Sequence, residues 1–152
     1  MTKIIILKPG IEEYEPWSKI YQMYLEFYNA SLTEEELRSV WSWIFAKNSQ
    51  KIHCYFAKLD DEVVGLAHFR EFLRPLKAVK GIFLDDLIVI PKCRRQKVGF
   101  HLIEAVKLYA KENSIPIVRW ITASDNSQAI KLYDAVANRT SWVTYDAKIE
   151  LE

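Results

Sequence analysis

The sequence predicts an α+β fold in three layers (α/β/α): a mixed, mostly antiparallel sheet with a parallel strand–helix–strand unit at its centre and helices on both faces. Residues 82–90 are almost all apolar and are closed by Pro91, as expected of a strand buried on both faces. A helical pattern begins at Val98 and runs to about residue 113, and a second apolar stretch follows at 115–121. Two helical patterns and a hairpin of short strands precede this unit.

The remaining elements follow from local signals. We expect an edge strand at 3–8, a helix at 11–27, and a second helix that starts at Thr33 with a Thr33–Glu36 capping box and ends near residue 48. Strands at 53–59 and 63–71 are joined by an acidic turn, and an irregular basic segment at 72–80 leads into the central strand. A helix at 123–137, with Asp125 as N-cap and Gln128 as its partner, precedes a last strand at 142–149.

Composition limits the class of protein. With 152 residues, of which 50% are hydrophobic and 13% aromatic, the chain suits a single domain over 1–152 with a real core. The net charge of +1, from 21 basic and 20 acidic residues, does not suggest a nucleic-acid partner. The apolar N-terminal run is too short for a signal peptide or a membrane span. Cys54 and Cys93 lack metal-like spacing, so we expect no metal, and two unpaired thiols fit a reducing cytoplasm.

A basic turn lies between the central strand and the following helix. It contains Lys92, Arg94, Arg95 and Lys97, and Gly99 follows. A helix N-terminus presents free backbone N–H groups, and here it would present them beside several cations. The turn is therefore a candidate anion site, most simply for a phosphate.

The residues around this turn resemble a known signature. Leu87-Ile88-Val89-Ile90-Pro91, followed by Arg94-Arg95-Gln96-Lys97-Val98-Gly99, is similar to the acetyl-coenzyme A motif of GNAT-type N-acetyltransferases, whose turn reads Arg/Gln-x-x-Gly-x-Gly/Ala. The resemblance implies that the turn holds the pyrophosphate and that the strand pairs with the pantetheine arm. It assigns to the coenzyme Leu87, Ile88, Val89, Ile90, Arg94, Arg95, Gln96, Lys97, Val98, Gly99 and Phe100, together with Asn126 and Tyr133.

One position departs from the family pattern. Lys97 stands where the family has its first glycine, and a lysine loses some of the freedom to adopt a positive φ. Its ammonium is able to contact a phosphate directly. We therefore expect a binding turn that is altered rather than destroyed.

Acetyl transfer needs a polarised thioester and a base for the amine. Backbone N–H groups near Val89 and Ile90 are candidates to polarise the thioester carbonyl. Asp85 and Asp86 are consecutive on a strand, so we expect their side chains on opposite faces, with one facing the acceptor. The resemblance to spermidine/spermine-type acetyltransferases, which have a Glu-Asp pair here, implies that Asp85 is the base and that Asp86 looks to the other face. The alternative is that both carboxylates are structural.

The departing thiolate needs a proton. Asn126-x-x-Ala129-x-x-Leu132-Tyr133 resembles the family helix in which the asparagine contacts the coenzyme and the tyrosine donates to sulfur, so Tyr133 is the implied acid. Its alternative is a core tyrosine. The residues after Tyr133 resemble a branch of fungal histone and polyamine acetyltransferases, which implies a homodimer through the last strands. Tyr145 then either reaches the acceptor pocket or lies with Trp142 in that interface.

Several residues are candidates for the acceptor pocket or for packing. The two early helices are rich in aromatic residues, including Tyr24, Tyr28, Trp41 and Trp43, which serve either the core or an interface, or wall an acceptor pocket with the acidic residues 34–36. The substrate-binding candidates are Asp86, Tyr28, Glu34 and Tyr145. His68 is expected to be a packed, hydrogen-bonded residue. Cys93 is either a small residue filling space or a reactive thiol.

The leading functional hypothesis is an N-acetyltransferase that moves an acetyl group from acetyl-CoA to a primary amine within a ternary complex. The amine belongs to a polyamine, a small amino compound, or a peptide or protein. The alternative is a non-catalytic module that binds an acyl-coenzyme A or a protein on the same fold. A phosphate-loop nucleotide hydrolase is excluded because the glycine-rich loop ending in Lys-Ser/Thr is missing.

Overall fold

The computed structural model describes residues 3–48 and 51–151, in two compact units, Met1–Ile121 and Thr122–Glu152. The described part of the first unit contains a five-stranded sheet in the order β1-β2-β3-β4-β5. Its strands are β1 (Ile4–Leu7), β2 (His53–Leu59), β3 (Glu62–Arg74), β4 (Val79–Val89) and β5 (Val118–Arg119). Neighbours from β1 to β4 are antiparallel and β4 pairs with β5 in parallel, which confirms the predicted mixed α+β fold.

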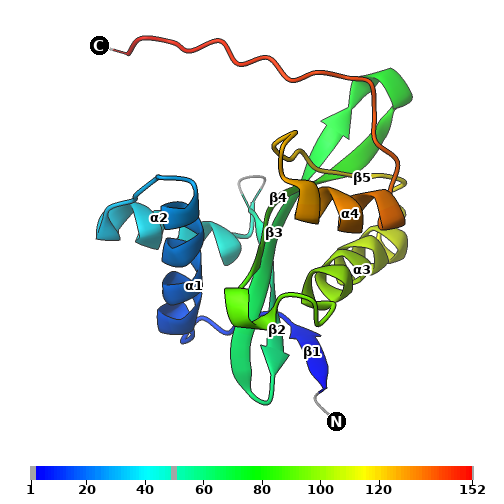
Figure 1. Cartoon of the computed structure of the whole chain (residues 1–152). Helices are drawn as coiled ribbons and strands as arrows, with labels where there is room; N and C mark the ends of the chain where they lie inside the picture. The colour runs from blue at the N-terminus through cyan, green and yellow to red at the C-terminus, as the bar shows by residue number, and fades with distance from the viewer. Residues whose placement is uncertain (1–2, 49–50, 152) are drawn as a thin grey trace. The chain divides into compact units, whose positions relative to one another are not determined.

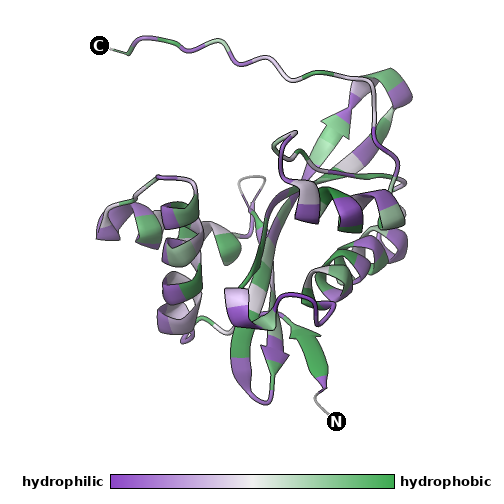
Figure 2. Cartoon of the chain, viewed as in Figure 1, coloured by the Kyte–Doolittle hydropathy of each residue, from purple (hydrophilic) through white to green (hydrophobic). Residues whose placement is uncertain are grey.

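Helices cover both faces of this sheet. Figure 1 shows α1 (Tyr14–Phe27) and α2 (Glu34–Ile44) on one face and α3 (Val98–Glu112) on the other. The predicted capping box is confirmed: Thr33 Oγ1 accepts from the Glu36 N–H at 3.1 Å, and the Glu36 carboxylate accepts from the Thr33 N–H at 2.8 Å. Each helix carries an apolar and a polar side, as the colouring in Figure 2 shows, so its apolar side is available to the sheet.

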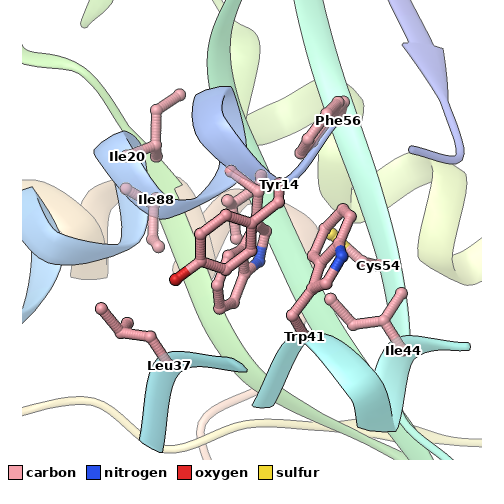
Figure 3. Close-up of a cluster of buried hydrophobic side chains, with 10 residues drawn as sticks. Tyr14, Ile20, Leu37, Trp41, Ile44, Cys54, Phe56 and Ile88 are labelled. Atoms are coloured by element: carbon pink, nitrogen blue, oxygen red, sulfur yellow. The ribbon is translucent and has the colours of Figure 1, made fainter. Parts of the chain in front are cut away.

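The core between α1, α2 and the sheet is strongly aromatic. Trp17 is fully buried at its centre, with its ring centroid 5.2 Å from that of Trp41 and 5.7 Å from that of Tyr14. Figure 3 shows this cluster, whose labelled members are Tyr14, Ile20, Leu37, Trp41, Ile44, Cys54, Phe56 and Ile88. Trp41 is therefore a core residue, whereas Trp43 is 46% exposed. The packing interpretation of Trp41 is confirmed.

Two strand predictions in the first unit were inaccurate. The segment 72–80, expected to be irregular, continues the β3–β4 hairpin, with pairs such as Phe72–Gly81 and Arg74–Val79. A 3₁₀ turn, η1 (Pro75–Lys77), and Ala78 in the left-handed region (φ 54°) close it. Pro75 fits at the start of this turn, where φ near −65° is needed. In contrast, the stretch 115–121 forms a strand at Val118–Arg119 alone.

The second unit contains α4 (Ser127–Val136) and an extended C-terminal segment. The N-cap is Asn126, whose Oδ1 accepts from the Ala129 N–H at 3.4 Å, so the prediction that Asp125 caps this helix was wrong by one residue. The strand predicted at 142–149 is not formed among the described residues either. An alternating apolar pattern is not sufficient to form a strand, because the backbone N–H and C=O groups also need a neighbouring strand edge for their hydrogen bonds. No helix in the described ranges has the length and apolar character needed to cross a bilayer.

Candidate functional site

The basic turn adopts the backbone geometry that the glycine of the family pattern would supply. After β4 a 3₁₀ turn, η2 (Pro91–Cys93), leads into the turn, and α3 begins at Val98. Lys97, the residue before the helix, has φ 64° and ψ 19°, which lies in the left-handed region. A residue with a Cβ adopts this region at a cost of about 1 kcal/mol, so the lysine preserves the turn. Cys93, the last residue of η2, is buried, in agreement with a space-filling role.

The start of α3 is open to an anion. The first backbone N–H to bond within the helix is that of His101, which donates to the Lys97 carbonyl at 3.0 Å. The N–H groups of Val98, Gly99 and Phe100 precede it and have no helical acceptor, and no side chain caps this terminus in the described structure. The side chains of Arg94, Arg95, Gln96 and Lys97 are exposed around it. These groups fit a phosphate or diphosphate. Lys92 instead pairs with Glu62 at 3.1 Å.

The second half of β4 has a free edge. Its pairing with β5 covers Ile82 and Phe83, and within the described residues the β5 side of β4 beyond them has no strand partner. The Ile90 N–H donates to the Val64 carbonyl at 2.9 Å, so it is not available for a ligand, contrary to the expectation. This bond makes Val89–Gly65 a non-hydrogen-bonded pair, so the Val89 N–H and C=O point away from β3, as do those of Leu87. Leu87 and Val89 thus present an edge to an extended ligand.

A β-bulge brings two carboxylates to one face of the sheet. β3 and β4 pair His68 with Asp86 but Phe69 with Leu84, which leaves Asp85 as an extra residue on β4. On a regular strand the two aspartates would point to opposite faces. The bulge removes that alternation.

Contacts identify the shared face. Asp86 contacts His68, which contacts Trp17 of α1. Asp85 contacts Arg70, which lies two residues after His68 on β3 and therefore on the same face. Both carboxylates lie on the α1 face, so the prediction that Asp86 looks to the other face was wrong.

The two aspartates have different partners. Asp86 Oδ2 lies 2.8 Å from Nδ1 of His68, a histidine that is 1% exposed. Asp85 Oδ2 lies 3.1 Å from Nε of Arg70, whose side chain is 45% exposed. Burial raises the pKa of Asp85 above its usual value, the Arg70 charge opposes this, and the negative charge of Asp86 adds to it. A carboxyl with a raised pKa is suited to accept a proton near neutral pH.

An aromatic wall faces this pair. The Tyr21 ring lies 5.1 Å from the His68 ring and 6.1 Å from the Tyr24 ring, and the Tyr28 ring follows 4.9 Å from that of Tyr24. Burial raises the pKa of the Tyr21 and Tyr24 hydroxyls, and the negative charge of Asp86 raises both further. The two phenols therefore stay neutral beside the carboxylates.

The other residues predicted for the acceptor or the coenzyme differ in their burial and in their hydrogen-bond partners. Glu34 accepts from the Tyr14 hydroxyl at 2.9 Å and from Arg38 Nε at 3.1 Å, so it already has partners. Tyr28 ends α1 and is 51% exposed beside the aromatic wall. Tyr145 is 90% exposed in the extended segment of the second unit. Asn126 caps α4 and Tyr133 lies half-buried on the same helix.

The sequence interpretation missed Trp17, Tyr21 and Arg70 as members of the site, and it treated His68 as a packed residue. His68 is indeed buried and hydrogen-bonded. One signal was available: Arg70 and His68 are two apart on a strand, and Trp17, Tyr21 and Tyr24 are spaced along one side of a helix. The packing of α1 against β3 brings these two sets of residues together, and the sequence does not show that packing. Among the described residues no group of three or more His, Cys, Asp or Glu side chains is placed to hold a metal ion.

Comparison with known proteins gives the class and then the family. The fold is that of solved acetyltransferase structures, and residues 17–137 match the model described as the Acetyltransferase (GNAT) family. The chain therefore belongs to the GNAT acetyltransferase family. It is 33% identical over 128 residues to the probable N-acetyltransferase camello of Xenopus laevis, a match that covers 81% of this chain. The chain spans about half of that relative, 55% of its length.

Solved structures share the fold. A crystal structure described as a probable acetyltransferase has a TM-score of 0.83 at 24% identity and covers 99% of each chain. An aminoglycoside N-acetyltransferase in complex with CoA has a TM-score of 0.83 at 16% identity, covering 97% of this chain and 96% of that one. A ribosomal-protein-alanine N-acetyltransferase from Brucella melitensis has a TM-score of 0.78 at 16% identity, covering 96% and 99%.

Proposed function

We propose that the protein transfers an acetyl group from acetyl-CoA to a primary amine by direct attack in a ternary complex. The observation that carries this proposal is the free edge of β4, which ends in the open N-terminus of α3 and carries two carboxylates on one face. The proposed coenzyme contacts are those assigned by the resemblance, with the Ile90 N–H now excluded. The whole chain, 1–152, is proposed to act as one acetyltransferase domain, since the family match runs across the boundary between the two units.

Each step of the reaction has a proposed residue. The Val89 N–H polarises the thioester carbonyl. Asp85 takes one proton from the acceptor ammonium, and the free amine attacks the carbonyl carbon. The carbon–sulfur bond breaks, Tyr133 gives its hydroxyl proton to the thiolate, and the nitrogen releases its second proton to solvent. Asp85 also releases its proton to solvent, and Tyr133 is reprotonated from solvent, so one proton is released per turnover. The support for Tyr133 and Asn126 is the motif resemblance and their placement on one helix.

The proposed acceptor is a cationic primary amine. Asp85 and Asp86 supply negative charge, and the rings of Tyr21, Tyr24 and Tyr28 supply faces that attract an ammonium. This environment favours a polyamine, and small amino compounds and peptide amines are the other members of the class. Tyr145 and Glu34 are proposed as outer contacts of the acceptor.

The first test is calorimetric titration with acetyl-CoA beside free coenzyme A. We expect micromolar binding, and we expect Arg94→Gln with Arg95→Gln to weaken it at least tenfold because two cations leave the anion turn. Lys111→Gln, which removes a cation from the other end of α3, is the matched control. Absence of binding at millimolar coenzyme would rule out the enzyme. Binding without acetylation across an amine panel would favour the non-catalytic module.

The role of Tyr133 has its own test. Tyr133→Phe keeps the ring and removes the hydroxyl, so we expect turnover to fall more than tenfold with little change in coenzyme affinity. Tyr55→Phe, on β2, is the matched control. Unchanged turnover in Tyr133→Phe would contradict proton donation by this residue.

We also propose a homodimer, formed through the C-terminal segment, in a reducing cytoplasm. In the segment 143–151 apolar residues alternate with polar ones, the apolar set being Val143, Tyr145, Ala147, Ile149 and Leu151, and a strand of this pattern needs an edge to pair with. Light scattering should give a dimer mass for the native chain and a monomer mass for Val143→Asp with Ile149→Asp. A native monomer would contradict the dimer. The two buried free thiols support the reducing compartment.

A further inference from the structure

We propose that His68 is a positioning residue: held by Trp17, it keeps Asp86 ionised beside Asp85, so that Asp85 and not Asp86 accepts the proton. This inference rests on the proposed acetyl transfer, because it assigns the two carboxylates of that site to separate roles. It is carried by the contacts between α1, β3 and β4.

The hydrogen bonds determine the form of the imidazole. The Trp17 indole Nε1–H lies 3.0 Å from His68 Nε2, and an indole nitrogen can only donate. His68 Nε2 must therefore accept, so it carries no hydrogen. A neutral imidazole then has its hydrogen on Nδ1, which donates to Asp86 Oδ2 at 2.8 Å. A doubly protonated ring would set two N–H groups against each other.

Burial keeps this arrangement in place. Trp17 is 0% exposed and His68 is 1% exposed, so water has no direct access to the bond between them. To take up a second proton, His68 would have to lose its bond to Trp17 inside the aromatic core. The short His68–Asp86 contact is therefore a neutral donor on a carboxylate rather than an ion pair.

The two carboxylates consequently differ in what stabilises their charge. Asp86 accepts a hydrogen bond from His68, and a donor to a carboxylate favours its ionised form. Asp85 has the partly exposed Arg70 as its partner, while burial and the Asp86 charge raise its pKa. Two neighbouring acids in unequal environments take different roles, and the proton goes to Asp85.

The other groups facing the pair come from three elements. α1 contributes the neutral phenols of Tyr21 and Tyr24, β3 contributes Arg70, and β2 contributes Cys54, whose thiol pKa is raised by burial and by the Asp86 charge. The phenols and the thiol do not ionise near neutral pH. Burial, Arg70 and Asp86 are thus the main influences on the pKa of Asp85, ahead of a smaller lowering by His68.

Nuclear magnetic resonance on the coenzyme-free protein tests the inference without any acetylation. Imidazole ¹⁵N shifts should report His68 as the Nδ1–H form. Side-chain ¹³C titration should give Asp85 a midpoint above the ordinary value of an aspartate. Asp86→Asn should lower the Asp85 midpoint by about one unit, since a like charge within a few ångströms has been removed. His53→Gln, which replaces a histidine on the opposite face of the sheet, should leave that midpoint unchanged.

A second variant tests the link to α1. Trp17→Phe removes the donor to His68 Nε2, so the imidazole ¹⁵N shifts should no longer report the Nδ1–H form alone. If Trp17→Phe does not fold, the Asp85 midpoint in Asp86→Asn still tests the inference, because Asp86 is partly exposed and its substitution should be tolerated. An Nε2–H imidazole, or an Asp85 midpoint unmoved in Asp86→Asn, would overturn the inference.

The pH dependence of acetylation gives an independent test of the assignment of the base. With an amine that is turned over, the acid limb of kcat/KM should follow the Asp85 midpoint and move down in Asp86→Asn. An unmoved acid limb would overturn the assignment of the base to Asp85. If no amine is acetylated, the proposed function fails while the resonance results still decide the state of His68 and Asp86.

Discussion

Nε of Arg70 lies 3.1 Å from Oδ2 of Asp85, and the Arg70 guanidinium also lies 4.9 Å from the centre of the Phe83 ring. The ring holds the guanidinium against the sheet, beside the carboxylate. Burial raises the pKa of Asp85, and this cation is the principal influence that lowers it. The pair therefore determines where the proposed base titrates.

Removing the cation should raise the titration midpoint of Asp85. We expect Arg70→Met to raise it by about one unit, because an opposite charge within a few ångströms favours the ionised form. The measurement is side-chain ¹³C titration. Lys80→Met removes a cation that pairs with Glu71 instead, so it should leave Asp85 unchanged. Equal midpoints in Arg70→Met and the native protein would contradict this account.

Asp85 should also make stability depend on pH. Its folded-state pKa lies above the ordinary value of 3.8, so between these two values the folded state binds more protons than the unfolded state. Its contribution is complete below pH 3.8 and is lost as the pH rises through the folded-state pKa. Asp85→Asn should therefore become more stable relative to the native protein as the pH rises from 3.5 to 7. Urea unfolding at several pH values measures this, and a constant difference would contradict it.

His53 should have the opposite dependence. Burial lowers its pKa from 6.5 to about 4, helped by the charges of Lys51 and Lys8 and opposed by Glu71. On acidification the unfolded state takes up the proton first, so stability is lost as the pH falls from about 6.5 to about 4. His53→Gln should lose less stability over this interval than the native protein does. Parallel stability curves would show that His53 titrates normally.

The left-handed residue before α3 should prefer glycine. Lys97→Gly removes the steric cost of φ 64°, and we expect it to raise the free energy of unfolding by about 1 kcal/mol. Lys92→Gly is the control, because Lys92 is not among the described positive-φ residues and should lose stability. If both variants were destabilised equally, the backbone at Lys97 would not be strained.

Gly65 should not tolerate a side chain. A Cβ there would lie 2.6 Å from the Ile88 carbonyl oxygen and 3.2 Å from Cγ1 of Val98, so strand or helix would have to move. We expect Gly65→Ala to cost about 2 kcal/mol in urea unfolding. Gly10→Ala is the control, since its close neighbour is the flexible end of Glu12. A fully stable Gly65→Ala would mean that β3 and α3 are less tightly packed than their contacts indicate.

Local signals in the sequence were sufficient for much of the fold. The Thr33–Glu36 capping box, the acidic hairpin turn and the strand at 53–59 were predicted because each depends on residues close together in the chain. The anion turn was predicted for the same reason, since strand, cations and helix start are consecutive. The sequence did not predict the long β3–β4 hairpin or the absence of a strand at 142–149, because strand pairing depends on a partner that is distant in the chain.

The arrangement of the carboxylates was decided by the tertiary structure. The sequence by itself determined that Asp85 and Asp86 are consecutive on a buried strand, and strand geometry then places them on opposite faces. Pairing with β3 introduces a bulge at this point, which turns both to the α1 face, and packing of α1 sets Trp17 against His68. A bulge is a mismatch between two strands, so one strand's sequence does not contain it, and the division of roles between the aspartates follows from that mismatch.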